Sequence, residues 1–362
     1  MHKLKILFLI PHPIQGASSR HRVYQYLPFL EKEGIGYRVS PFVSESFYKI
    51  LYKKGFFFKK ICFIFSALLR RIFDCFFIFF SDVIFIHLES SPFPILFLEH
   101  VAHFFNKPII FDFDDAIFLK RSHAIHNFRL LLKSHRIPPK LISMSTQVIV
   151  GNPYLKTYAS QHIADNRVTV LPTTIDVKKF PFQKQNRPDL IIGWIGMHTT
   201  FSYFEKLLPI FPEIAQRYPF TLKIIGAPKK IELPGVQIVQ KEWHLSEEID
   251  DILSFDIGLY PLFDPHWDQG KASFKALLYM AAYVPCIASD VGRNKDVIQD
   301  GKNGFLVSSK DQWIEKIILL LKSQDLRHQL ATEGRKTVEN YFSVEQHTQT
   351  FIRVLQKTAN PL

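Results

Sequence analysis

The chain has 362 residues, of which 47% are hydrophobic and 22% are charged. This composition excludes an intrinsically disordered chain, and the length favours two domains of ordinary size over a single one. The formal net charge of +12 suits an acidic partner, but no nucleic-acid-binding module accompanies it, so we expect no nucleic acid partner. The three cysteines have neither CxxC nor Cys/His spacing, which argues against a zinc site.

Short apolar runs alternate with helical stretches along the first half of the chain. The run at residues 5–10 is too short for the apolar core of a signal peptide, and no small-residue cleavage site follows it, so we interpret it as a buried strand. Further strands are predicted at residues 37–43, 82–86, 108–113, 148–150 and 168–171. Because helical segments separate the strands, the sheet should be parallel.

The second half of the chain repeats this order. Its strands are predicted at residues 190–195, 220–225, 236–238, 257–260, 286–288 and 305–307, with helices between them. The polar segment at residues 178–188 is the best candidate for a linker. We therefore expect a first domain over residues 1–178, a second over residues 179–340, and a last helix over about residues 341–357.

The loop after the first strand combines small residues with two arginines. Glycine and serine let the backbone approach a ligand, and arginines bind phosphate or carboxylate in a forked geometry. The candidate ligand contacts are Gly16, Ser18, Ser19, Arg20 and Arg22. Alternatively, Ser19 caps a helix whose first turn carries solvated arginines. His87 and Glu89, at the end of the strand predicted at 82–86, are further candidates, although a lone histidine there is often structural.

Aspartates gather at the end of the strand predicted at 108–113, in the sequence FDFDD. Three carboxylates at this position repel one another unless a positive charge or a proton offsets them, and such sites shift pKa values. We therefore select Asp114 and Asp115 as candidate catalytic residues. Two other interpretations stay open: the aspartates bind a divalent metal, or they cap a helix that starts at Ala116.

A candidate anion site begins at Gly270. Lys271 and Lys275 are four residues apart and share one face of a predicted helix, whose N-terminus adds a partial positive charge beside Ser273. A diphosphate fits such a site. The apolar run that follows ends in a polar loop from Ser289, where open α/β sheets bind ligands. A surface lysine pair on an ordinary βαβ unit is the alternative.

The segment at residues 267–307 resembles the donor site of the retaining glycosyltransferases of family four. The matching stretches are MAAY at 280–283, VPCIAS at 284–289, VGR at 291–293, DGKNGFLV at 300–307 and WDQGKASFK at 267–275. The resemblance implies the GT-B fold, in which two doubly wound Rossmann-like domains face each other across a cleft and a C-terminal helix packs back on the first domain. It also implies that the chain moves a sugar from a nucleotide-diphosphate sugar to a glycan or lipid-linked acceptor, in surface polysaccharide or glycolipid synthesis, and retains the anomeric configuration.

The resemblance also assigns roles to residues. It aligns the family's His-Asp pair with Asp114 and Asp115, so that Asp114 acts as a base or holds sugar hydroxyls, and it implies no cofactor and no metal, since the nucleotide sugar is a substrate. The donor-binding residues are expected to be Gly196, His198, Thr199, Thr200, Gly270, Lys271, Ser273, Lys275 and Tyr279. The family's Glu-x7-Glu pair falls on Gly270 and Leu278, and Leu278 cannot accept ribose hydroxyls. Two alternatives therefore stay open: an inactive GT-B scaffold protein and a sugar-nucleotide epimerase of the same fold.

Residues 47–80 are rich in phenylalanine and punctuated by lysine and arginine. The charges interrupt every apolar run of about 20 residues, which argues against a membrane-spanning helix. A basic amphipathic helix that lies on an anionic bilayer accounts for the pattern. The same residues also fit a buried helix whose lysines reach solvent. We favour the first interpretation and expect a cytoplasmic protein that is peripherally associated with the inner face of the membrane.

Overall fold

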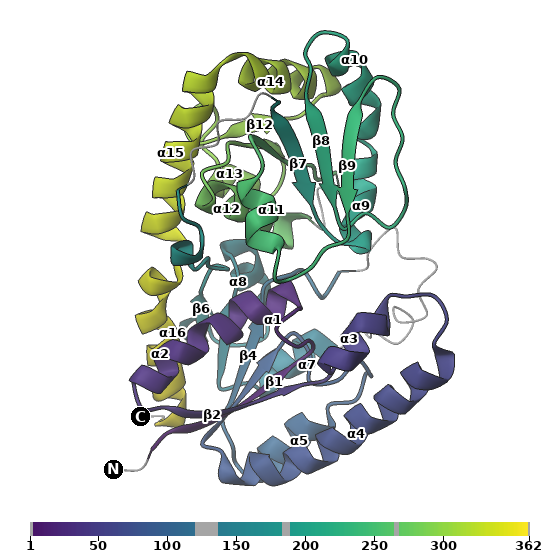
Figure 1. Cartoon of the computed structure of the whole chain (residues 1–362). Helices are drawn as coiled ribbons and strands as arrows, with labels where there is room; N and C mark the ends of the chain where they lie inside the picture. The colour runs from purple at the N-terminus through teal and green to yellow at the C-terminus, as the bar shows by residue number, and fades with distance from the viewer. Residues whose placement is uncertain (1–2, 120–136, 183–188, 264–267, 361–362) are drawn as a thin grey trace. The chain divides into compact units, whose positions relative to one another are not determined.

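The computed structural model describes residues 3–119, 137–182, 189–263 and 268–360. The chain divides into two compact units: unit 1 comprises residues 1–173 and 347–362, and unit 2 comprises residues 174–346. Each unit contains one six-stranded sheet with helices on both faces (Figure 1). Part of the predicted linker, residues 183–188, lies outside the described residues.

The sheet of unit 1 has the strand order β2-β1-β3-β4-β5-β6, and all neighbouring strands are parallel. Its strands are β1 (Lys5–Ile10), β2 (Gly36–Pro41), β3 (Val83–His87), β4 (Ile109–Phe113), β5 (Gln147–Val150) and β6 (Val168–Val170). They are nearly continuous apolar runs because both faces of the sheet are covered. Every strand predicted for this half is present, with bounds that differ by a few residues.

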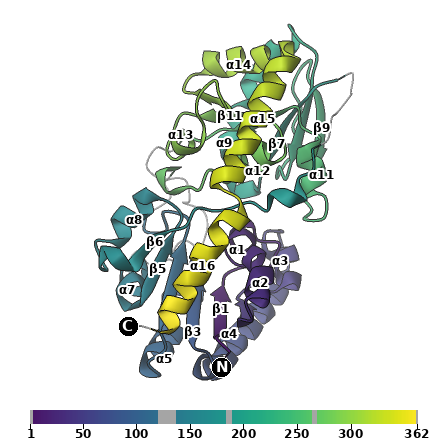
Figure 2. The same ribbon diagram turned by 90° about the vertical axis from the view of Figure 1, so that its left-hand side faces the viewer.

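Alternate side chains of these strands pack against two layers of helices. Leu7 and Leu9 pack with Ile78 of α4 on one face, whereas Phe85 contacts Phe351 of α16 on the other, with ring centroids 5.6 Å apart. Figure 2 shows α16 lying across this second face. The helices of this unit are α1 (Ala17–Arg22), α2 (Leu27–Lys32), α3 (Glu45–Leu51), α4 (Phe57–Phe80), α5 (Phe97–Phe104), α7 (Ile137–Met144), α8 (Pro153–Ala159) and most of α16 (Val344–Ala359).

The sheet of unit 2 is also parallel throughout, with the strand order β12-β11-β10-β7-β8-β9. Its strands are β7 (Ile191–Ile195), β8 (Thr221–Ile225), β9 (Gln237–Lys241), β10 (Ile257–Tyr260), β11 (Cys286–Ser289) and β12 (Phe305–Val307). One face packs on α9 (His198–Glu205), α10 (Phe211–Ala215) and α14 (Lys310–Lys322), and the other on α11 (Glu248–Leu253), α12 (Phe274–Ala281), α13 (Asn294–Val297) and α15 (Gln324–Tyr341). The strands predicted for this half are present as well.

The strand order reverses once in each sheet, between β1 and β3 in unit 1 and between β7 and β10 in unit 2. In doubly wound sheets, ligands bind beyond the carboxyl ends of the strands at such a switch point. The loops that follow β1 and β3, and those that follow β7 and β10, are therefore the places where each unit can build a site.

The helix α4 is the longest in the described part of the chain, at 24 residues. It packs beside α3 and α5, and most of its phenylalanines are exposed. The interpretation of this segment as a buried helix is therefore wrong. No helix within the described ranges is long and apolar enough to cross a membrane.

Candidate functional site

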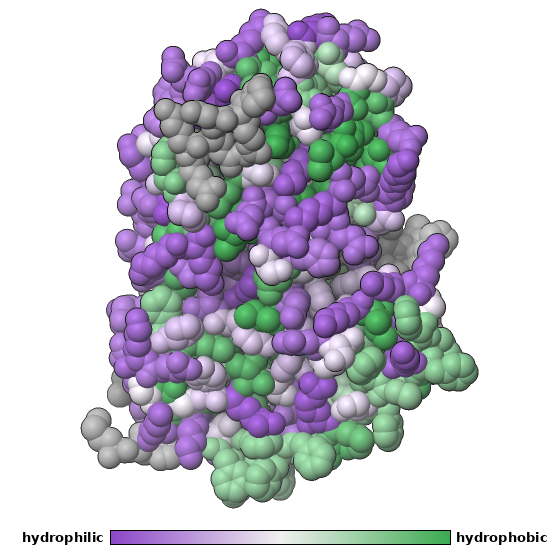
Figure 3. Space-filling view, viewed as in Figure 1, coloured by the Kyte–Doolittle hydropathy of each residue, from purple (hydrophilic) through white to green (hydrophobic). Residues whose placement is uncertain are grey.

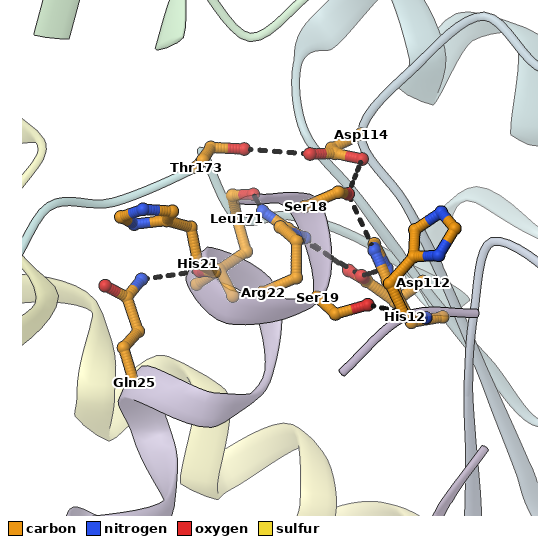
Figure 4. Close-up of polar contacts among 11 residues, drawn as sticks. His12, Ser18, Ser19, His21, Arg22, Gln25, Asp112, Asp114, Leu171 and Thr173 are labelled. Atoms are coloured by element: carbon orange, nitrogen blue, oxygen red, sulfur yellow. Dashed lines mark hydrogen bonds and ion pairs between the residues drawn. The ribbon is translucent and has the colours of Figure 1, made fainter. Parts of the chain in front are cut away.

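A buried ion pair lies at the switch point of unit 1. Asp112 of β4 and Arg22 of α1 are each 1% exposed, and the guanidinium donates to both carboxylate oxygens of Asp112 and, over 2.6 Å, to the carbonyl of Leu171 (Figure 4). Burial alone raises the pKa of Asp112, but the charge of Arg22 and a hydrogen bond from His87 hold that pKa below its ordinary value. Asp112 is therefore ionised.

His87, the last residue of β3, connects this pair to the predicted catalytic carboxylate. Its ring is fully buried, with Nδ1 2.6 Å from Asp112 Oδ2 and Nε2 2.7 Å from Ser18 Oγ. Ser18 Oγ is in turn 3.0 Å from Asp114 Oδ1. Asp112, His87, Ser18 and Asp114 thus form one hydrogen-bonded chain, which comes from two strand ends and the start of α1.

Asp114, directly after β4, is half-buried and held at both oxygens. Ser18 contacts Oδ1, and the hydroxyl of Thr173 donates to Oδ2 over 3.3 Å. The Ser18 hydroxyl has one proton, so it donates either to His87 or to Asp114. Ser18 therefore connects Asp114 to His87 by a path along which a proton can pass. Asp115 is half-buried beside it.

The loop residues predicted to bind a ligand have structural contacts instead. The helix starts at Ala17 with Gly16 as its N-cap, and a Cβ at Gly16 would lie 2.4 Å from that of His12. Ser19 is fully buried inside the helix and accepts a hydrogen bond from the backbone of His12. The prediction that Ser19 and Arg22 contact a ligand is therefore wrong, because both side chains are buried and bonded within the unit. The alternative, in which Ser19 caps the helix and the arginines are solvated, is also wrong, because Gly16 is the N-cap and the arginines are buried.

The remaining candidates of unit 1 lie nearby. Arg20 is 8% exposed, and its guanidinium donates to the ring of His21 and to the carbonyl of Ile14. Glu89, two residues beyond His87, is half-buried. Among the residues that the structure describes, no three His, Cys, Asp or Glu side chains converge as metal ligands do.

The predicted lysine site in unit 2 is built differently from the expected helix face. The helix α12 starts at Phe274, and its N-cap Ser273 has a left-handed φ of 53° and is buried. Lys271 therefore precedes the helix, and its Nζ lies 3.2 Å from Oδ1 of the fully buried Asp268. It also lies 4.4 Å from the ring centroid of Tyr203, whose hydroxyl donates to Asp268. The prediction that the two lysines share a helix face is wrong.

Lys275 lies in the first turn of α12, with its ammonium 5.4 Å from the ring centroid of Tyr260. The residue is half-buried. Burial, and then the charge of Lys271, lower the pKa of Lys275 to about 7, although Asp268 opposes this. Within the described ranges, no carboxylate pairs with it. A cation that its own protein leaves uncompensated is suited to an anionic ligand.

Backbone packing holds this site in place. Gly270 is buried at the end of a short 3-10 turn that begins at Asp268, and a Cβ at Gly292 would lie only 2.5 Å from the carbonyl oxygen of Asp268. Glycine at 292, with its φ of 52°, lets the loop after β11 pack against this turn. Trp267 of the sequence motif lies outside the described residues.

The loop after β7 leads into α9. His198 and Thr199 are exposed at the start of this helix. The hydroxyl of Thr200 accepts a hydrogen bond from the backbone N–H of Met197 and so helps to cap the N-terminus of α9. A Cβ at Gly196 would lie 2.3 Å from the ring of Trp194, so glycine is needed where the strand turns into the helix.

Tyr279 was predicted to bind the donor, and this prediction is wrong. The side chain is fully buried, and burial raises its pKa well above the ordinary value. Its hydroxyl accepts a hydrogen bond from the backbone of Ile195 and donates to the carbonyl of Leu259, each over 3.3 Å. Tyr279 therefore fastens β7 to β10 from inside the core.

Sequence reasoning also missed residues that complete these sites. Arg22 pairs with Asp112 across 90 positions, Tyr203 with Asp268 across 65 and Thr173 with Asp114 across 59. No local sequence pattern predicts such contacts. A signal did exist for Asp268, because an acidic residue three positions before Lys271 is a ready partner for that lysine.

Comparison with known proteins gives matches in both sequence and structure. Residues 189–323 match the family model described as glycosyl transferases group 1. The capsular polysaccharide biosynthesis glycosyltransferase CapM of Staphylococcus aureus is 25% identical over 216 residues, which cover 52% of this chain. The match spans 55% of the length of CapM, a little more than half of that relative.

Solved structures match over almost the whole chain. A glycosyltransferase from Rickettsia africae superposes with a TM-score of 0.72 at 14% identity and covers 100% of both chains. HepE of Anabaena, solved in complex with UDP and glucose, gives a TM-score of 0.66 at 14% identity and covers 98% of this chain and 100% of its own. These similarities confirm the predicted fold class, two doubly wound parallel α/β sheets of the GT-B type.

Proposed function

We propose that this chain, whose residues 189–323 match the family model of glycosyl transferases group 1, moves a sugar from a nucleotide-diphosphate sugar to a glycan or lipid-linked acceptor. The observation that carries the proposal is the ammonium of Lys275, which lies uncompensated at the start of α12, following the switch point of unit 2. The UDP complex of the structurally similar HepE supports a nucleoside diphosphate as the ligand.

The donor site stabilises the leaving group. As the glycosidic bond breaks, negative charge gathers on the diphosphate, so a cation there binds the transition state more tightly than the substrate. Lys275 and the N-terminus of α12 supply this charge, and Lys271 adds to it from the turn that Asp268 and Tyr203 fix. Gly196, His198 and Thr199 lie at the neighbouring strand end and are further donor contacts.

Asp114 acts in unit 1 as the group that orients an acceptor hydroxyl and takes its proton. Ser18 and Thr173 hold the carboxylate, and the chain through Ser18 to His87 gives the proton a buried acceptor. The reaction retains the anomeric configuration, as the resemblance implies, and requires neither a cofactor nor a metal. The similarity to CapM supports a role in surface polysaccharide synthesis.

We also propose that the protein works at the inner face of the membrane as a peripheral protein in the cytoplasm. The charge of +12 and the basic, phenylalanine-rich residues 47–80 support this location. A lipid-linked acceptor is held at that surface, so a membrane-bound enzyme encounters it by diffusion along the membrane.

Two other functions fit some of the residues. An inactive scaffold protein fits Gly270 and Leu278, which replace the two glutamates of the family pattern, and Leu278 is buried in the core at 3% exposure. An epimerase of the same fold is the second alternative.

A panel of UDP-, GDP- and ADP-sugars tests the three proposals. Binding is followed by thermal shift and turnover by nucleotide release in the absence and presence of lipid extracts. We expect one nucleotide sugar to stabilise the protein and to release its nucleoside diphosphate slowly. Interconversion of sugars without release supports an epimerase, and no binding of any donor supports a scaffold.

A further inference from the structure

The helix α4 differs from an ordinary surface helix because it buries two charged side chains and exposes many apolar ones. Its buried side carries an ion pair, Arg71 with Asp74, whose side chains are 5% and 0% exposed. Arg71 also donates to the carbonyls of Ser90, Ser40 and Ile10, which fixes the helix to the ends of β1 and β2. A helix of a soluble protein normally buries its apolar stripe and exposes its charges.

The exposed side of α4 is almost entirely apolar. We call it, together with its continuation on and around α5, the α4–α5 face; Figure 3 shows it as pale green side chains gathered over these two helices. Phe58 is 81% exposed and Phe104 79%. The face consists of Phe57, Phe58, Ile61, Phe65, Leu68, Leu69, Ile72, Phe73, Phe76, Phe79, Phe80, Ile95, Phe97, Phe104 and Phe105. A continuous apolar surface of this kind marks an interaction site.

The charged side chains exposed beside α4 are basic. Between Glu45 and Asp82 the only acidic residue is Asp74, which is buried, and the acidic residue of α5, Glu99, is 1% exposed. Lys53, Lys54, Lys59 and Lys60 gather where α4 begins. At the other end, Lys107 lies over the ring of Phe79, 5.8 Å from its centroid.

We propose that the α4–α5 face binds an anionic lipid bilayer, with α4 parallel to the surface, its phenylalanine rings among the acyl chains and its lysines among the lipid phosphates. The face offers few hydrogen-bonding groups and no tryptophan or tyrosine, which protein interfaces favour. The proposal rests on the peripheral location proposed above but not on the proposed reaction. Because the Arg71–Asp74 pair fastens α4 to the sheet, the helix is formed before it meets the lipid.

Vesicle binding tests this surface. Full-length protein is co-sedimented with phosphatidylcholine vesicles with and without phosphatidylglycerol, and circular dichroism is recorded in both states. We expect binding only to the anionic vesicles, without a gain in helix. Replacing Lys53, Lys54, Lys59 and Lys60 by Gln should weaken binding by roughly fivefold for each lysine removed. The double variant Phe65→Gln, Phe73→Gln, at positions that are 63% and 69% exposed, should weaken it by roughly tenfold for each ring.

Matched variants in unit 2 serve as controls. Replacing Lys230, Lys302, Lys310 and Lys336 by Gln removes the same charge from exposed positions, and the double variant Tyr341→Gln, Phe182→Gln removes two exposed rings. Both should bind vesicles like the unaltered chain. The proposal is overturned if the Phe65, Phe73 variant binds as tightly as its control, if neutral vesicles bind equally well, or if the face only drives self-association in sedimentation velocity.

The lipid proposal and the proposed reaction fail separately. Nucleotide release from a soluble donor, measured without vesicles, should be the same in the chain with Phe65 and Phe73 replaced as in the unaltered chain. Loss of vesicle binding with intact nucleotide release therefore concerns only the surface. Absence of nucleotide release from a chain that binds vesicles concerns only the reaction.

Discussion

The two candidate sites occupy equivalent places in two similar sheets but balance their charges in opposite ways. In unit 1, Asp112, Arg22 and His87 are buried and bonded to one another, and Asp114 is held by two hydroxyls. In unit 2, Lys271 has a carboxylate partner, whereas Lys275 is desolvated beside another cation and its pKa falls to about 7. One site is complete within its own unit, and the other lacks an anion.

This difference separates two tasks that charged residues perform in proteins. A network whose charges are already paired fixes geometry, and altering it costs stability or alters the position of a reacting group. An unpaired, desolvated cation costs stability until a ligand arrives, and altering it changes binding. The first three predictions below test this contrast by substitution, and the fourth by pH.

The largest effect is expected at Asp114. Asp114→Asn keeps the size of the side chain but removes its ability to accept a proton, so turnover should fall by about 10² to 10⁴-fold while donor binding is unchanged. Steady-state kinetics with the active nucleotide sugar and calorimetric binding of its nucleoside diphosphate measure the two quantities. Asp165→Asn is the control, since Asp165 is an exposed carboxylate of the same unit that pairs with Lys156; a loss there as large as at Asp114 contradicts the assignment.

Asp112→Asn should destabilise the chain. The substitution leaves the charge of Arg22 buried without a partner, which costs roughly 3–5 kcal/mol of unfolding free energy. Chemical denaturation measures this, and Asp165→Asn is the matched control in unit 1, because its pair with Lys156 is exposed to solvent. Equal stability of the two variants would show that the buried pair contributes nothing beyond a surface pair.

Lys275→Ala should weaken nucleoside diphosphate binding without lowering stability. The loss of one charge-assisted hydrogen bond corresponds to roughly 1.5–3 kcal/mol of binding free energy. The unfolding free energy should stay equal or rise, because a desolvated ammonium is removed. Calorimetric titration with UDP or GDP checks the first statement, and the exposed Lys295 provides the control substitution. If Lys275→Ala binds the nucleoside diphosphate with unchanged affinity, the donor does not bind at Lys275.

The smallest effect is a pH dependence of donor binding. In the free protein the pKa of Lys275 is about 7, and a bound diphosphate raises it. Below pH 7 the amine is already charged, whereas above pH 7 binding must take up a proton, so affinity should fall by up to about tenfold per pH unit. Phosphate ionises near pH 6, so measurements above pH 7 isolate the lysine. Titrations in buffers of different ionisation enthalpy should detect proton uptake, and Lys275→Ala should abolish it.

Much of the fold was predictable because buried parallel strands leave a strong pattern. Residues 6–10 and 109–111 are apolar on both faces of the sheet, and the turns around these strands contain glycine, proline or aspartate. Strand bounds moved by a few residues where edge strands carry polar side chains, as in β9, which is predicted at 236–238 and found at Gln237–Lys241. The family motif at residues 267–307 was also recognisable, because it is one continuous stretch of sequence.

The site details were not predictable, for two physical reasons. Partners such as Arg22 and Asp112 meet only through the tertiary fold, so no nearby spacing records them. Local backbone conformation is the second reason. Ser273 adopts a left-handed φ and is the N-cap of α12, so Lys271 lies before the helix and not on the face that it was expected to share with Lys275. Composition also could not tell that α4 buries Arg71 and Asp74 and exposes most of its phenylalanines, since both orientations use the same residues.

Phe351, near the C-terminal end of the chain, completes the core of the N-terminal unit by stacking on Tyr26, with ring centroids 4.4 Å apart. During synthesis, unit 2 is therefore made between the two pieces of unit 1. At about 5–20 residues per second, residues 174–346 take roughly ten to thirty seconds to appear. Throughout that interval Tyr26 and Phe85 lack their aromatic neighbour, so a nascent chain of this kind is exposed to aggregation for longer than its size suggests.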